Sequence, residues 1–185
     1  VLLVRKDLDF TSPKVHQLKV DFQNETSFRE ALSGVDVVFC SIGTTQAKVK
    51  GDLVAYRKVD YDIPVNAAKF AASQGCTHFL LVSSVGADAN ASNFYLKIKG
   101  EVEAAVLSTS IPIISIFRPS MLLGQRNEFR LGERIGQALM KGLSFLIPSK
   151  YKAIEAKAVA GAMVAAAGQF KQPSKNMLEY KEMVS

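Results

Sequence analysis

The chain has 185 residues, of which 48% are hydrophobic and 22% are charged, and its net charge is +6. This length and balance fit one globular domain with a sizeable core and exclude a disordered or fibrous protein. No apolar run approaches the roughly 18 residues that a membrane-spanning helix needs. Because the basic residues are scattered among acidic ones, we expect an anionic small molecule as the ligand and no nucleic-acid partner.

The two cysteines, Cys40 and Cys76, have no metal-like spacing and could form at most one disulfide. Such sparse cysteine usage is typical of a protein in a reducing compartment, so we expect a cytoplasmic location. The sequence suggests no metal site.

Short apolar runs alternate with helical patterns along the first half of the chain. Thr26 and Ser27 are candidate N-caps of a short helix that Gly34 ends. A longer helix has Pro64 in its first turn and Gly75 at its end. The predicted elements are strands at 1–4, 17–22 and 35–43 and helices at 26–34 and 62–75.

The second half continues the alternation, with strands at 78–84 and 112–120 and helices at 93–108, 130–142 and 156–170. Strands that are apolar nearly throughout, with helices between them, are typical of a parallel sheet covered on both faces. We therefore predict an α/β protein with a three-layer, doubly wound, Rossmann-like parallel sheet. We expect one domain over residues 1–185.

Polar and small residues follow each predicted strand, at the edge where a sheet of this kind binds ligands. They are distant in sequence, but the carboxyl ends of parallel strands meet at one edge. The candidates are Arg5, Lys6, Asp21, Phe22, Ser41, Ile42, Gly43, Ser83, Ser84, Pro119 and Ser120.

Tyr95 and Lys99 are one turn apart and lie on the same face of the predicted helix 93–108. A free tyrosine is a poor proton shuttle at neutral pH, but a neighbouring ammonium favours its phenolate form. With the hydroxyl of Ser84 nearby, the pair could pass a proton to or from a carbonyl oxygen. The alternative is that Tyr95 is a core aromatic and Lys99 a solvated surface residue.

Taken together, these features resemble a short-chain dehydrogenase/reductase of the extended or atypical kind, and within that family the Tat-interacting-protein-like branch. The resemblance covers nearly the whole chain and rests on a combination of motifs. They are CSIGTT (40–45), VDYDIPVNAAKFA (59–71), LVSSVGAD (81–88), FYLKIKGEVE (94–103) and FRPSMLLGQRNEFRLGERIG (117–136). The resemblance implies a nicotinamide dinucleotide cofactor and a catalytic trio of Ser84, Tyr95 and Lys99, with Ser83 as the fallback for Ser84.

The resemblance also implies which cofactor the chain prefers. At the position of Arg5, an acidic residue would bind the 2′-hydroxyl of NAD, whereas arginine favours the 2′-phosphate of NADP. Lys6 adds a second positive charge, and Asp7 and Asp9 oppose it. We expect NADP(H) to be favoured over NAD(H); a solvated strand end is the alternative for both cations.

Further positions match residues around the family's cofactor and substrate. Tyr95 and Lys99 also belong to the cofactor-binding set, since such a lysine can hold a ribose. The other cofactor matches are Asp21 and Phe22 at the adenine edge, Ser41, Ile42 and Gly43 below the cofactor's centre, and Pro119 and Ser120 beside the nicotinamide. A small substrate-side part is expected from about residue 120. There Arg126, Arg130 and Arg134 match a lid that could contact an anionic substrate, and solvated helix surface is the alternative.

The chain departs from the family at its start. Family members begin with a strand and a Gly-rich turn, GxxGxxG, whose amides hold the pyrophosphate. None of the 12 glycines forms that pattern, and the run 1–4 already matches the second strand of the family. We therefore expect that about 30 residues, one strand and one helix, are missing ahead of it. Because the first strand is central in the order 3-2-1-4-5-6, the strands at 1–4 and 35–43 should face an empty slot.

Three functions remain open from the sequence. The leading one is an NADP(H)-dependent oxidoreductase acting on a small carbonyl or alcohol substrate. A regulatory or sensor protein that binds NADPH without turnover is the first alternative. A nucleotide-sugar epimerase or dehydratase is the second, although it would need a larger C-terminal region. A homodimer or a protein partner is compatible with each.

Overall fold

The computed structural model describes residues 1–124 and 148–184. Its strands are β1 (Leu2–Val4), β2 (Gln17–Lys19), β3 (Val37–Cys40), β4 (His78–Val82), β5 (Ile113–Phe117), β6 (Leu122–Leu123), β7 (Ile154–Glu155) and β8 (Ser174–Leu178). Its helices are α1 (Glu25–Glu30), α2 (Leu53–Arg57), α3 (Ile63–Ser73), α4 (Phe94–Leu107), α6 (Ala156–Gln169) and α7 (Tyr180–Val184), with a π-helical turn η1 (Lys58–Asp62) and a 3-10 turn η2 (Ser149–Tyr151). The helix predicted at 130–142 lies outside the described residues.

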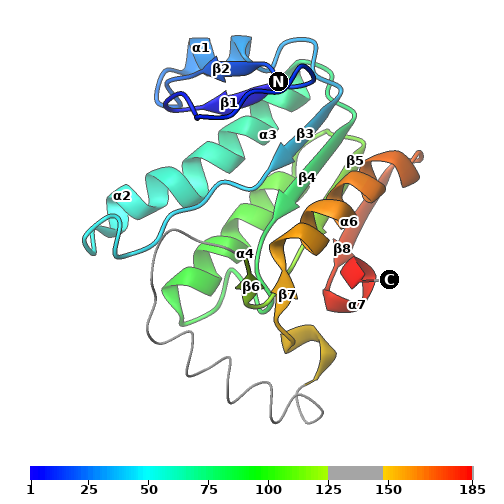
Figure 1. Ribbon diagram of the computed structural model, residues 1–185. Coiled ribbons are helices and arrows are strands. Elements are labelled where there is room, and N and C mark those ends of the chain that lie inside the picture. Colours follow the sequence, from blue (N-terminus) through cyan, green and yellow to red (C-terminus); the bar gives the residue numbers. More distant parts are fainter. Residues whose placement is uncertain (125–147, 185) are drawn as a thin grey trace.

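The main sheet has four parallel strands in the order β3-β4-β5-β8 (Figure 1). Two further parallel pairs, β1-β2 and β6-β7, form small sheets of their own. The parallel strands and their covering helices confirm the predicted fold class. No β8 was expected from the sequence, because its residues, SKNML, do not form an apolar run.

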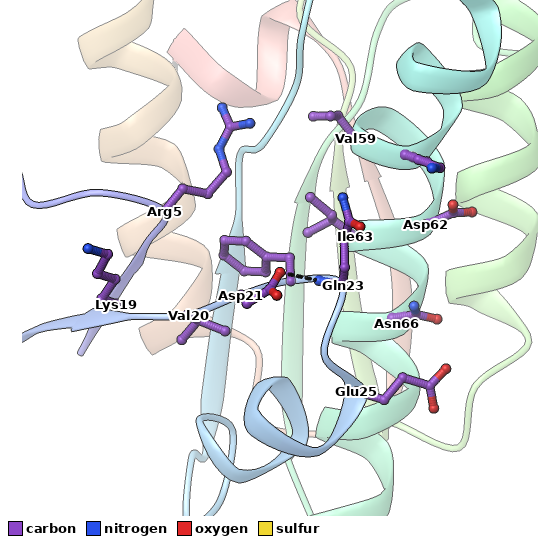
Figure 2. Close-up of a pocket in the computed structure, with 12 residues that line it drawn as sticks. Arg5, Lys19, Val20, Asp21, Gln23, Glu25, Val59, Asp62, Ile63 and Asn66 are labelled. Atoms are coloured by element: carbon purple, nitrogen blue, oxygen red, sulfur yellow. Dashed lines mark hydrogen bonds between the residues drawn. The ribbon is translucent and has the colours of Figure 1, made fainter.

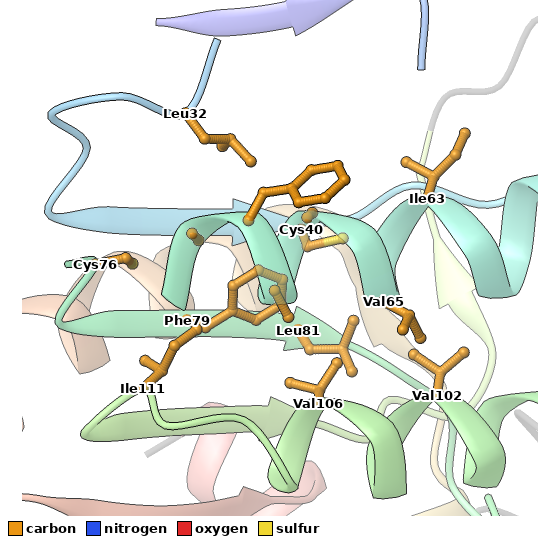
Figure 3. Close-up of a cluster of buried hydrophobic side chains, with 14 of the residues drawn as sticks. Leu32, Cys40, Ile63, Val65, Cys76, Phe79, Leu81, Val102, Val106 and Ile111 are labelled. Carbon is orange, nitrogen blue, oxygen red and sulfur yellow. The ribbon is translucent and has the colours of Figure 1, made fainter. Parts of the chain in front are cut away.

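Two apolar cores cover the two faces of the sheet. Successive side chains of a strand point to opposite faces, so Phe79 and Leu81 lie in one core and Leu80 in the other. The first core is closed by α1, α3 and α4, with Val102 and Val106 of α4 facing the strands (Figure 3). Helices α6 and α7 close the second core (Figure 1). The result is the expected three-layer arrangement.

Asparagine side chains cap the first turns of two helices. Asn93 accepts a hydrogen bond from the backbone nitrogen of Leu96 and so begins α4. Asn24 caps α1 in the same way, accepting from Ser27. The predicted caps Thr26 and Ser27 are therefore wrong: both lie inside α1, because the extended backbone of Asn24 already directs its oxygen to the first turn.

The expected slot beside β1 is present. Among the described strands, β1 pairs with β2 and β3 pairs with β4, and β1 is not paired with β3. A cavity of about 600 Å³ separates them, lined by Leu2 and Leu3 on one side and Val38 and Phe39 on the other. Phe39 is 49% exposed although it lies in a parallel strand, a class of strand that is normally covered.

Helix α4 packs very closely against the loop that follows β4. A Cβ atom on Gly100 would lie 2.2 Å from the nitrogen of Ala89 and 2.6 Å from the Cα of Asp88. The backbone nitrogen of Asp88 also donates to the carbonyl of Leu96, at 3.1 Å. Only glycine allows this approach, which fixes the loop relative to the helix that carries Tyr95.

Adding a strand, a Gly-rich turn and a helix ahead of Val1 gives an extended form of the chain. We expect this extended form to fold cooperatively. The added strand would pair with β1 and β3 and cover the apolar side chains between them. We expect residues 1–185 alone to be insoluble or to melt without a cooperative transition. The extended form should unfold sharply, at a temperature that NADPH raises. Circular dichroism during heating checks this, and a sharp, NADPH-shifted transition of the short form would contradict the assignment of β1 as the family's second strand.

Gly100→Ala should destabilise the protein by roughly 1–3 kcal/mol, because the added methyl group overlaps the backbone of the neighbouring loop. Gly161→Ala is the matched control, since Gly161 also lies inside a helix but has open space around its Cβ position. That variant should gain about 0.5–1 kcal/mol from helix propensity. Urea unfolding of both variants in the extended form measures the difference, and a stabilised Gly100→Ala would show that the loop does not pack this closely.

Candidate functional site

A pocket of about 540 Å³ lies beyond the carboxyl ends of β1 and β2. Figure 2 shows Arg5 on one side of the pocket and Val59 and Asp62 on the other, with Asp21 between them. The strand ends supply the first side, and the turn η1 with the start of α3 supplies the second. The pocket therefore joins segments about 50 residues apart in the sequence.

Three of the sequence-predicted cofactor residues share this pocket, namely Arg5, Asp21 and Phe22. The Asp21 carboxylate accepts a hydrogen bond of 2.9 Å from the backbone nitrogen of Gln23, which fixes its orientation. Lys6 is exposed and is not among the residues that line the pocket. The lining contains both basic and acidic side chains, so Arg5 is not part of a uniformly positive surface.

The predicted pair Tyr95 and Lys99 lies on α4, as expected. Lys99 Nζ is 5.9 Å from the centroid of the Tyr95 ring. Tyr95 is 39% exposed, so a substrate can reach its hydroxyl, whereas Lys99 is only 8% exposed. The structure therefore contradicts the alternative of a core tyrosine and a solvated lysine: exposure and burial are the other way round.

Lys99 is buried together with a carboxylate that the sequence reasoning missed. Its Nζ lies 3.1 Å from Oδ1 of Asp60, which is 1% exposed. The second carboxylate oxygen, Oδ2, accepts a hydrogen bond of 2.6 Å from the backbone nitrogen of Thr44. The acidic residues at 60 and 62 in the VDYDIP stretch were a signal for a buried carboxylate. Residues two apart lie on nearly opposite sides of a helix, so a helix that packs on one face buries one of them.

Burial keeps two titratable groups near the Lys99–Asp60 ion pair neutral, the hydroxyl of Tyr56 and the thiol of Cys40. Burial, followed by the negative charge of Asp60, raises the pKa of the Tyr56 hydroxyl above its ordinary value. Burial also raises the pKa of the Cys40 thiol to about 11. Both cysteines are free and buried, and neither is a reactive thiolate at neutral pH.

Ser83 and Ser84 directly follow β4, and both are buried. The hydroxyl of Ser84 donates to the carbonyl of Val85 at 3.3 Å. The Oγ of Ser83 has no hydrogen-bond partner among the described residues. A buried hydroxyl without a partner is costly, so Ser83 is suited to bind a ligand atom or a water molecule.

The loops after β3 and β5 hold the remaining predicted cofactor residues. Of Ser41, Ile42 and Gly43, the first two line the cavity between β1 and β3. A Cβ atom on Gly43 would lie 3.4 Å from Asp60 Oδ1, so this loop passes close to the buried ion pair.

After β5, the carbonyl of Pro119 accepts a hydrogen bond of 2.9 Å from the nitrogen of Val85, which links the loops after β4 and β5. The hydroxyl of Ser120 donates to the carbonyl of Lys152 and is thereby engaged by the segment before β7.

Other candidates lie away from this edge or outside the structure. Arg126, Arg130 and Arg134 lie outside the described residues. His78 is at the start of β4, where burial lowers its pKa and Nε2 lies 2.9 Å from Ser115 Oγ. Within residues 1–124 and 148–184, no three His, Cys, Asp or Glu side chains are grouped so that they could hold a metal ion. None of the helices in these two ranges is long and apolar enough to cross a membrane.

The turn η1 connects the pocket with the ion pair. It presents Val59 and Asp62 to the pocket and Asp60 to Lys99. The site is thus an elongated edge with a mixed-charge pocket at one end and an exposed phenol, a buried ammonium and an unpartnered serine at the other. Such an arrangement fits an extended ligand with a reactive group at one end, and Tyr95 could exchange a proton with that group.

Comparison with known proteins identifies relatives along most of the chain. A profile described as NAD(P)H-binding matches residues 1–169. Protein HTATIP2 of Rattus norvegicus is 39% identical over 145 residues, which cover 77% of this chain and 59% of the rat protein. The mitochondrial protein FMP52 of Eremothecium gossypii is 35% identical over 130 residues, covering 70% of this chain and 57% of its own length. The chain therefore spans a little under three fifths of these two relatives.

Two solved structures share the fold at low sequence identity. MoeE5 in complex with UDP-glucuronic acid and NAD has a TM-score of 0.71 and is 12% identical, covering 96% of this chain and 66% of its own. UDP-N-acetylglucosamine 4-epimerase from Bacillus cereus has a TM-score of 0.65 and is 16% identical, covering 98% and 72% of the two chains. At this identity the likeness establishes the fold alone.

The names of the relatives contradict the expected cytoplasmic location. Three FMP52 proteins, from Eremothecium gossypii, Debaryomyces hansenii and Candida albicans, carry the description mitochondrial. The expectation rested on two unpaired cysteines, which indicate reducing surroundings but do not distinguish one such compartment from another.

The parallel sheet with helices on both faces, the site at its carboxyl edge and the match along residues 1–169 agree with one another. The chain belongs to the NAD(P)H-binding Rossmann-fold family, in the branch that contains HTATIP2 and FMP52.

Proposed function

We propose that this protein is an NADP(H)-dependent oxidoreductase of the short-chain dehydrogenase/reductase type that acts on a carbonyl or alcohol. The observation that carries the proposal is the pairing of an exposed phenol, Tyr95, with a buried ammonium, Lys99, 5.9 Å from the ring centroid. A buried ammonium near a solvent-accessible phenol is placed to stabilise the phenolate that forms when the phenol gives its proton to a substrate. A tyrosine in that setting can act as an acid in one direction and as a base in the other.

The adenosine end of the cofactor would be held in the pocket of Arg5, Asp21 and Phe22. The guanidinium is suited to a 2′-phosphate, which supports NADP(H) over NAD(H). The loop 41–43 and the hydroxyl of Ser83 would hold the other half, which reaches Tyr95 and Lys99. When bound, the nicotinamide ring supplies or accepts a hydride.

The chain's own residues would handle the proton. In reduction, the Tyr95 hydroxyl donates its proton to the carbonyl oxygen, and Lys99 stabilises the phenolate that remains. The Ser84 hydroxyl would turn from the carbonyl of Val85 to donate a hydrogen bond that orients this oxygen. The Ser83 hydroxyl, which has no partner among the described residues, offers a second donor. In the oxidation of an alcohol each step runs in reverse. The part of the chain from about residue 120 would supply the substrate side.

Oxidation of NADPH by the extended form, assayed against aldehydes, ketones and quinones, tests the proposal. We expect turnover with at least one of these classes. Tight NADPH binding with no turnover of any of them would favour a regulatory or sensor role instead.

Tyr95→Phe should lower turnover by about 10²–10⁴-fold, the usual contribution of general acid–base catalysis, because only the hydroxyl is lost. The affinity for NADPH should stay within a few-fold of the original. Tyr180→Phe, which removes a hydroxyl beside the second core, is the matched control and should keep full activity. Steady-state kinetics and fluorescence titration measure both quantities, and full activity of Tyr95→Phe would refute the catalytic role.

Arg5→Ala should weaken NADPH binding by about 1.5–3 kcal/mol and leave NADH binding nearly unchanged, because only NADPH carries the 2′-phosphate. Lys69→Ala removes an exposed positive charge that is absent from the pocket lining and should affect neither cofactor. Calorimetry with the extended form measures all four affinities. Equal losses for NADPH and NADH would mean that Arg5 does not discriminate between them.

A further inference from the structure

Apolar side chains are exposed at the end of the site that carries Tyr95. Leu53 and Val54 begin α2 and are 48% and 68% exposed, and Tyr95 in the first turn of α4 is 39% exposed. The slot between β1 and β3 does not account for them, because its exposed apolar lining consists of Val1, Leu2, Phe10 and Phe39. Single exposed apolar residues are common, whereas a group of them beside a site indicates a binding surface.

Leu53 is connected to Tyr95 through two aromatic rings. Leu53 and Tyr56 are three positions apart on α2, so their side chains are neighbours on one face of the helix. The ring of Tyr56 packs edge to face on that of Phe94, with 5.4 Å between the centroids, and Phe94 directly precedes Tyr95 on α4. We call Leu53, Tyr56 and Phe94 the apolar wall. It continues from the start of α2 to the phenol of Tyr95.

Tyr56 belongs to the apolar wall as an uncharged ring. It is buried, and its hydroxyl has a raised pKa because of burial first, then the negative charge of Asp60 and then that of a Tyr95 phenolate. The last of these influences requires that the two phenols lie near each other. Tyr56 therefore contributes carbon surface beside Tyr95 and no charge at neutral pH.

The charged side chains at the start of α2 are engaged away from the apolar wall. Asp52 caps the helix, and its carboxylate accepts hydrogen bonds from the first-turn nitrogens. Arg57 pairs with Glu101 at 2.6 Å, and Lys58 lines the pocket of Arg5. The apolar wall thus has no charge of its own, and the nearest charges of α2 already have partners or face the cofactor pocket.

We propose that the apolar wall binds the hydrocarbon part of the substrate, so that the enzyme acts on carbonyl compounds that carry an alkyl chain or aromatic ring of several carbon atoms. This inference rests on the proposed function, since it assumes that the carbonyl oxygen is held at Tyr95. The substrate's apolar group would lie along Phe94 and reach Leu53. A nucleotide sugar would gain neither an ion pair for its diphosphate nor a hydrogen bond for its hydroxyls from this surface.

Reduction of butanal, hexanal and octanal by the extended form with NADPH tests the proposal. The value of kcat/KM should rise roughly two- to fourfold for each methylene that the apolar wall covers, the usual effect of burying such a group. UDP-glucose should not slow the reduction of octanal. Equal kcat/KM values along the series, turnover of other carbonyls but of none of these, or competitive inhibition by UDP-glucose would overturn the apolar wall as a substrate site.

Leu53→Asp should lower kcat/KM for octanal by about tenfold and leave that for butanal within about threefold. An ionised carboxylate keeps its water and does not bind an alkyl chain, whereas the shorter substrate does not reach it.

Val54→Asp is the matched control, because Val54 is the more exposed residue but lies about 100° further around the helix, on the side of Arg57. Both new carboxylates would be in the first turn of α2, where the helix dipole favours them equally, so both variants should unfold at the same temperature. Only Leu53→Asp should flatten the dependence on chain length. The same change in both variants would overturn the proposal.

A second measurement does not depend on turnover. In the presence of NADP⁺ no hydride is available, so 2-octanone binds without reacting, and ligand-observed NMR gives its affinity for the extended form. Leu53→Asp should weaken this binding about tenfold and Val54→Asp should not. An unchanged affinity in Leu53→Asp, or a change in subunit assembly by light scattering in place of a change in affinity, would overturn the proposal; the latter would identify a contact between copies of the chain.

The two proposals fail in different ways. Turnover of none of the aldehydes, ketones and quinones would mean that the proposed reaction is wrong, and with it the apolar wall as a substrate site. Turnover of carbonyls without a preference for longer chains would leave the proposed reaction standing and overturn the apolar wall alone.

Discussion

The buried ion pair between Lys99 and Asp60 imposes a constraint that the rest of the site must satisfy. Two charges inside a protein are tolerated only when they are paired and their remaining hydrogen-bonding capacity is satisfied. The pair therefore requires that η1, α4 and the loop after β3 meet at one point, and the nitrogen of Thr44 completes the carboxylate's shell. Tyr95 is exposed one turn before Lys99. The position of the Tyr95 phenol thus depends on a charge that is itself out of reach of solvent.

The close approach of α4 to the loop after β4 serves the same arrangement. Gly100, next to Lys99, lets the backbone of that loop lie against the helix, which brings Ser83 and Ser84 to the same edge as Tyr95. A second buried ion pair, between Glu103 and Arg118, lies one turn further along α4. Helix α4 therefore holds this edge of the sheet through backbone packing and two ion pairs, in addition to its apolar face.

The pocket end of the site is attached differently. Strands β1 and β2 share no backbone ladder with the main sheet. They are joined to it through side-chain packing in the first core, where Leu3 and Val20 lie and where Phe28 of α1 contacts both Phe22 and Phe70 edge to face, at 4.8 and 5.5 Å between ring centroids. Side-chain packing of this kind orients neighbouring elements less strictly than a row of backbone hydrogen bonds does. The placement of Arg5 relative to Tyr95 hence depends on what occupies the space between β1 and β3.

The sequence by itself determined the fold class, the main strands and helices of the first half of the chain, and the presence of a phenol and an ammonium one turn apart. These follow from local periodicity, because apolar runs and helical spacing are properties of neighbouring residues. It also located Arg5, Asp21 and Phe22 at strand ends, which share one pocket in the structure. Only the tertiary structure revealed β8, whose residues form neither an apolar run nor an apolar–polar alternation, and the pairing of Asp60, whose partner is 39 residues away along the chain. Whether a charge is buried, and which charge compensates it, is decided by contacts between distant segments, and no local pattern encodes those.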